Sequence, residues 1–74
     1  MPDYVPVACS FHDRLEHLAL GRRVCTVTFV EAGREQVAEG RIADIVTSRG
    51  AEFIVLAGSG DRIRLDRIRD IRPV

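Results

Sequence analysis

The sequence predicts a mainly β protein of the α+β class, in which one N-terminal helix precedes a small, strongly bent, five-stranded antiparallel sheet. Two observations predict it: apolar residues recur at spacings of three and four up to about residue 20, and they alternate with polar residues after residue 22. Short strands joined by tight turns in a chain of 74 residues are typical of small SH3-like or Sm-like barrels. Closure of such a barrel would remove the exposed edges of the sheet.

The chain is expected to form a single domain over residues 1–74. A chain this short buries only about 60% of its unfolded surface and cannot divide its core in two. Residues 1–9 contain Pro2 and Pro6, which restrict the backbone and lack an N–H donor, so they are expected to form an extended arm. The barrel is expected to occupy residues 22–72.

The helix is expected at residues 10–20. Ser10 and Asp13 have the spacing of a capping box, in which each side chain accepts a hydrogen bond from the backbone of the other residue. Gly21 follows where a helix would stop. One apolar stripe runs along the helix at spacings of four and three, and it consists of Phe11, Leu15 and Leu18.

The strands follow from alternation and from turn residues. Gly40 interrupts the second strand, where a missing side chain favours a bulge or sharp bend and would let the sheet curl. The five strands are expected at 23–30, 35–47, 52–56, 62–66 and, for the last and shortest, 68–71.

The charge balance argues against a phosphate-backbone partner. Eleven basic residues, all arginine, are matched by eleven acidic residues, whereas strong nucleic-acid binders usually have a basic excess. No run of about 18 apolar residues exists, and the N-terminus lacks the features of a signal peptide, so no membrane association and a cytoplasmic location are expected.

The soft metal ligands of the chain do not form a complete site. Cys9 and His12 have half of a zinc-like spacing, but the second half is missing, and Cys25 is expected on the inward face of a strand. A cysteine and histidines also suggest nucleophilic catalysis, yet the chain has no nucleophile elbow or oxyanion loop and is too small for a substrate cleft. We therefore expect no metal, no cofactor and no enzymatic activity.

An arginine-rich stretch ends the chain and permits two interpretations. It could follow the phosphates of RNA, as in an Sm-like RNA-binding module, or it could be a solvated strand face with cross-strand ion pairs. The interleaved acids favour the second interpretation. The residues concerned are Arg62, Arg64, Arg67, Arg69 and Arg72, against Asp61, Asp66 and Asp70.

The first 17 residues carry an excess of acidic side chains. Asp13 and Glu16 are one helical turn apart and share one side of the predicted helix, and Asp3 lies on the arm before them. These acids could contact a partner, or they could serve only the capping box and the helix dipole. The residues alone slightly favour the second interpretation.

Several short motifs together resemble the Rof (YaeO) family of Rho-binding antiterminators. The N-terminal Tyr-x-Pro-Ile/Val-x-Cys followed by Asp-x-Leu-Glu is fairly specific, and the match runs from residue 4 to residue 71. The chain differs from the acidic members of the family in having no net charge. The motifs are Tyr4-x-Pro6-Val7-x-Cys9, His12-Asp13-x-Leu15-Glu16, Ala43-Asp44-Ile45, Glu52-Phe53-Ile54 and Ile63-x-Leu65-Asp66-x-Ile68.

This resemblance implies a helix on an Sm-like barrel that inhibits Rho-dependent transcription termination. The helix and the neighbouring acidic surface would bind the RNA-binding domain of Rho and exclude RNA from its primary site. Asp13 and Glu16 stand at motif positions of the family, and His12 stands where an aromatic residue or histidine is usual. With Asp3 on the arm, these residues are the expected Rho contacts. We expect a monomer, because the helix would cover the surface that a ring of such barrels uses.

Overall fold

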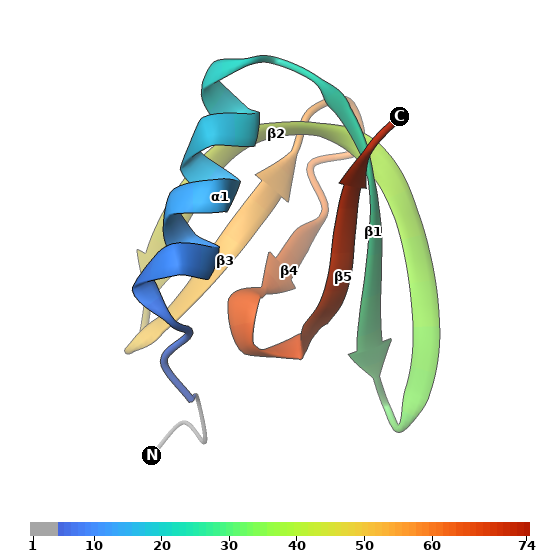
Figure 1. Ribbon diagram of the computed structural model, residues 1–74. Helices are drawn as coiled ribbons and strands as arrows, with labels where there is room; N and C mark the ends of the chain where they lie inside the picture. The colour runs from blue at the N-terminus through green and yellow to red at the C-terminus, as the bar shows by residue number, and fades with distance from the viewer. Residues whose placement is uncertain (1–4) are drawn as a thin grey trace.

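The computed structural model describes residues 5–74 and shows one helix followed by a five-stranded antiparallel sheet (Figure 1). The mainly β prediction with an N-terminal helix is therefore confirmed. The elements in chain order are α1 (Cys9–Leu20), β1 (Val24–Glu31), β2 (Arg34–Ser48), β3 (Ala51–Leu56), β4 (Arg62–Arg64), the short 3-10 helix η1 (Leu65–Arg67) and β5 (Ile68–Pro73).

The start of α1 differs from the prediction. Ala8 is the N-cap, and its carbonyl oxygen accepts hydrogen bonds from the backbone N–H groups of Phe11 at 3.0 Å and His12 at 3.1 Å. No side chain caps this end, so the predicted capping box of Ser10 and Asp13 is wrong. The extended backbone of Ala8 already directs its carbonyl into the first turn, which leaves Ser10 inside the helix, past the capping position.

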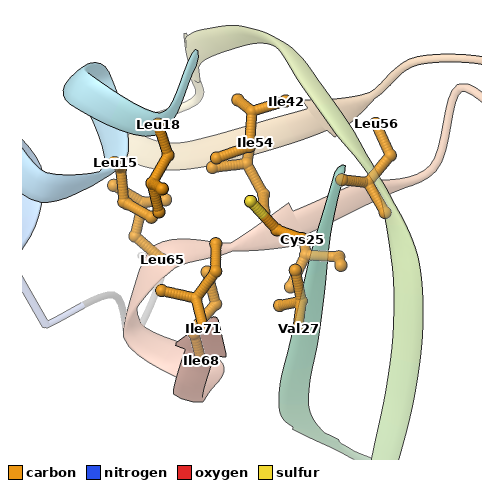
Figure 2. Packing of buried hydrophobic residues seen from close by; sticks show 11 residues of the cluster. Leu15, Leu18, Cys25, Val27, Ile42, Ile54, Leu56, Leu65, Ile68 and Ile71 are labelled. Atoms are coloured by element: carbon orange, nitrogen blue, oxygen red, sulfur yellow. The ribbon is translucent and has the colours of Figure 1, made fainter. Parts of the chain in front are cut away.

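The apolar stripe of α1 packs on the sheet as predicted. Leu15 is fully buried, Leu18 is 7% exposed and the half-buried Phe11 packs against them. Figure 2 shows Leu15 and Leu18 directed toward the side chains of the sheet. The helix ends at the predicted place, where the N–H of Gly21 donates to the carbonyl of His17 at 3.0 Å. The buried cluster consists of Leu15, Leu18, Cys25, Val27, Ile42, Ile54, Leu56, Ile63, Leu65, Ile68 and Ile71.

The long strand β2 holds the two halves of the sheet together. Its residues 34–41 pair with β1 and its residues 42–48 pair with β3, and Figure 1 shows it curving around the molecule between these partners. The register with β3 shifts between Ile42 and Asp44. The irregularity was predicted at Gly40, but it lies at Ala43, three residues later. It allows β2 to change direction as it passes from β1 to β3.

The sheet is open. Its strand order is β4-β3-β2-β1-β5, so among the described residues β4 and β5 are the two edges and the predicted closure is not formed. The predicted strand 62–66 stops at Arg64 because the chain turns through η1 before β5 begins. Ile63 and Leu65 nevertheless point inward as predicted, with exposures of 4% and 0%. Asp66, predicted to face outward, is instead only 12% exposed.

Candidate functional site: an acidic groove beside the helix

A groove of about 510 Å³ runs between α1 and the second half of β2. One wall comes from the helix, the other from β2, and β3 contributes Glu52 at one end. We call it the acidic groove, because three of its side chains are carboxylates and none is a lysine or arginine. Its lining residues are His12, Glu16, Ala19, Leu20, Ala43, Asp44, Ile45, Thr47 and Glu52.

His12 connects two of the three carboxylates. Its Nδ1 lies 3.0 Å from Oε1 of Glu16, one turn along the helix, and its Nε2 lies 2.9 Å from Oε2 of Glu52 on β3. Ionised carboxylates only accept hydrogen bonds, so both contacts are hydrogen bonds only when the imidazole is protonated on both nitrogens. In that state His12 holds the side chains of Glu16 and Glu52 near each other and ties the helix to the sheet.

Asp44 supplies the third carboxylate from the opposite wall. Its Oδ1 accepts a hydrogen bond from the backbone N–H of Ile45 at 2.8 Å, and the residue is exposed. Most of the other lining residues are apolar. Leu20, at the end of the helix, is 84% exposed and leaves apolar surface beside the acids.

The four predicted contact residues are only partly brought together. His12 and Glu16 line the acidic groove, while Asp13 is exposed, lies outside its lining and makes no hydrogen bond or ion pair within residues 5–74. Asp3 lies outside the described residues. The helical spacing of Asp13 and Glu16 placed them one turn apart correctly, but only Glu16 turns toward β2.

Sequence reasoning did not single out Asp44 and Glu52 as site residues. Both residues come from strands. Their proximity to the helix depends on the antiparallel pairing of β2 with β3, in which Thr47 lies opposite Glu52. One signal was available, since aspartate is depleted in strands and Asp44 sits inside one. An aspartate inside a strand indicates either a local irregularity of the strand or a function.

The arginine-rich C-terminal stretch contains ion pairs of two kinds. Arg64 donates to Asp66 from Nε at 3.0 Å and from Nη2 at 2.7 Å, and both side chains are at most 19% exposed. Arg72 and Asp70 form a pair at 2.7 Å that is far more exposed. The interpretation of this stretch as a solvated strand face therefore fits Arg72 but not Arg64. The expected cross-strand pairing is wrong for both pairs, because each joins residues two positions apart in the sequence.

The half-buried pair of Arg64 and Asp66 changes the acidity of Asp66. Burial by itself would raise the pKa of this carboxyl group. The hydrogen bonds from Arg64 and from the backbone N–H of Val5, together with the charges of Arg64 and Arg67, outweigh burial and lower the pKa below its ordinary value. Asp66 thus anchors the arm to η1 through Val5.

The two cysteines are free, with Cys9 exposed and Cys25 buried. Burial raises the pKa of the Cys25 thiol, although the charges of Arg23 and Arg14 act in the opposite direction. This placement agrees with the prediction that Cys25 faces inward. Within residues 5–74, no group of three or more His, Cys, Asp or Glu side chains could hold a metal ion.

Comparisons of the chain with family models, curated proteins and solved structures give no match. No helix within residues 5–74 is long and apolar enough to cross a membrane.

Proposed function

We propose that this protein is a non-catalytic inhibitor of Rho that binds the RNA-binding domain of Rho through α1 and the acidic groove. The observation that carries the proposal is the convergence of Glu16, Asp44 and Glu52, from three separate elements, around one open groove. A protein surface that binds the phosphates of RNA is cationic. Carboxylates held in place by a rigid fold are electrostatically complementary to such a surface. Rho is selected as the partner by the resemblance of the chain to the Rof family.

The fold supports the same proposal. We take the bent sheet as an Sm-like barrel that is open between β4 and β5, with α1 packed beside it, as the resemblance implies. In this arrangement the helix needs no rearrangement before binding, because Leu15 and Leu18 already fix it to the core. A preorganised contact loses less conformational entropy on binding than a flexible one. A partner of this kind places the protein in the cytoplasm.

The neutral total charge limits how the contact can work. With eleven basic and eleven acidic residues, the whole molecule exerts little long-range attraction. The attraction is local, and charges beyond a Debye length of about 8 Å at physiological salt are largely screened. Binding should therefore depend on the carboxylates of the groove and not on the total charge.

The test is a calorimetric titration of the cognate Rho RNA-binding domain with wild-type protein and with the Glu16→Arg/Asp44→Arg variant. We expect the double reversal to weaken binding by at least about tenfold, since each reversal places like charges together. The matched control is Glu35→Arg/Glu39→Arg, which changes the total charge equally on exposed residues of β2 outside the groove. Equal affinities of the two variants would refute the groove as the contact, and no binding by the wild type would refute Rho as the partner.

A further inference from the structure

A second hollow, of about 200 Å³, lies near the open seam of the sheet and shares no residue with the acidic groove. It is formed by the end of β1, by β3, by β4 and by η1. We call it the seam hollow, and its chemistry is opposite to that of the groove. Its lining residues are Phe29, Val30, Glu31, Phe53, Arg62, Ile63, Arg64 and Arg67.

Two of its three arginines are available to a ligand. Arg64 is engaged by Asp66, but Arg62 and Arg67 make no hydrogen bond or ion pair within the described part of the chain. Arg62 is exposed and Arg67 is half-buried. The only acidic residue in the lining is Glu31, so the two arginines leave the hollow with a positive excess.

Two phenyl rings also line the seam hollow. Phe29 is half-buried and packs against the core, which fixes its position. Phe53 is also half-buried, yet among the described residues it is not one of those that pack against the core cluster. The charge of Arg67 also acts on Asp66, but neither Arg62 nor Arg67 makes a hydrogen bond or ion pair within residues 5–74. An aromatic ring that contributes little to the core, beside two such guanidinium groups, has the composition of a site that stacks bases and holds phosphates.

We propose that the seam hollow binds one nucleotide of a single-stranded nucleic acid, with the base stacked on Phe53 and the adjoining phosphates held by Arg62 and Arg67. Base stacking on an aromatic ring tolerates any base, and guanidinium groups bind phosphate oxygens in a bidentate manner. This site is independent of the contact with Rho. The site uses fewer arginines than a whole arginine-lined strand face would, because Arg64 forms an ion pair with Asp66 and Arg72 forms one with Asp70.

The experiment measures the fluorescence anisotropy of a labelled oligouridylate during titration with the full chain at low salt, in the absence of Rho. Arg62→Gln/Arg67→Gln should weaken binding by about tenfold or more and should reduce the slope of log K against log salt by about 1.4, or roughly 0.7 per phosphate contact. Phe53→Leu should weaken binding by about tenfold while keeping an apolar side chain at this position. Circular dichroism melting confirms that each variant is folded.

The charge control is Arg49→Gln, which removes an exposed arginine in the turn between β2 and β3 that lines neither the groove nor the seam hollow. Its affinity should equal that of the wild type. A loss as large as the one caused by Arg62→Gln/Arg67→Gln would overturn the proposal, as would no binding of the strand at low salt. An oligothymidylate distinguishes DNA from RNA, and uridine monophosphate that binds as tightly as the strand would overturn the assignment to a strand.

Discussion

Asp66 and Asp70 are four residues apart, and each pairs with an arginine, but their environments differ. The carboxylate of Asp66 is 12% exposed and accepts two hydrogen bonds from Arg64, while that of Asp70 is 43% exposed and meets an Arg72 that is 78% exposed. Water screens the second pair, so its contribution to stability is expected to be below about 1 kcal/mol. The first pair is shielded and also holds the arm through Val5.

Asp66→Asn is therefore expected to lower the free energy of unfolding by about 2 kcal/mol, the usual range for hydrogen bonds to a charged group. Asp70→Asn, the matched control, should change it by less than about 1 kcal/mol. Urea denaturation at neutral pH measures both values. Equal effects of the two substitutions would show that the difference in exposure does not change how much each ion pair stabilises the fold.

The same pair predicts a pH dependence. Because the folded pKa of Asp66 lies below its ordinary value of 3.8, the ionised carboxylate stabilises the fold at pH values above 3.8. This contribution is lost as the pH falls through the lowered pKa of the folded state. The difference in unfolding free energy between wild type and Asp66→Asn should thus be constant near neutral pH and shrink in acid. An undiminished difference at about pH 2 would contradict the account.

For individual residues, the sequence predicted the burial of apolar side chains better than that of polar ones. Alternation and helical spacing predicted the burial of Cys25, Ile63 and Leu65, because the period of an element decides which side chains face the core. Asp66 was placed outward by the same alternation. It is shielded because the chain leaves the strand conformation at η1, and no period indicates such a departure.

Among the elements, β2 has its register irregularity at a position other than its glycine, Gly40. The register shift lies between Ile42 and Asp44, and Gly40 has ordinary surroundings. A Cβ atom added at Gly40 would lie 3.6 Å from Cβ of Leu56 and 3.7 Å from the carbonyl oxygen of Ala57, which are normal van der Waals distances. Gly40 has no positive φ that would demand glycine.

Gly40→Ala is consequently expected to leave stability unchanged or to raise it by up to about 1 kcal/mol, because alanine restricts the unfolded chain more than glycine does. Gly33→Ala is the control, since Gly33 has a φ of +74° in the turn between β1 and β2. There a side chain is strained, and a loss of about 1 to 2 kcal/mol is expected. Thermal melting of both variants measures these changes in stability. A large loss of stability in Gly40→Ala would show that β2 needs a glycine at this position.

The elements were predicted well in number and order but less well at their ends. The helix begins at Cys9 because the backbone of Ala8 caps it without a side chain, and a capping motif in the sequence cannot reveal this. The bulge at Ala43 results from strand pairing across the sheet, so it too is invisible in a local pattern. His12 and Glu52 are 40 residues apart and meet only in the folded chain, where α1 lies against β2 and β3 is the neighbour of β2 in the sheet.

For the whole molecule, the zero net charge conceals a separation of charge. The acidic groove gathers three carboxylates beside α1. The seam hollow, near the open edge, gathers two arginines that make no hydrogen bond or ion pair within the described residues. Composition sums these charges and predicts neither surface. Of the expected contact residues, His12 and Glu16 proved to line the groove, whereas Asp13 does not.

We propose that the protein takes the place of RNA on Rho, and a competition experiment measures this directly. The Rho RNA-binding domain is saturated with fluorescent RNA, and the Arg62→Gln/Arg67→Gln variant is added, so that the seam hollow cannot itself retain the RNA. We predict that the anisotropy falls to the value of free RNA as the variant binds Rho. A complex in which Rho holds both the RNA and the variant would contradict the account.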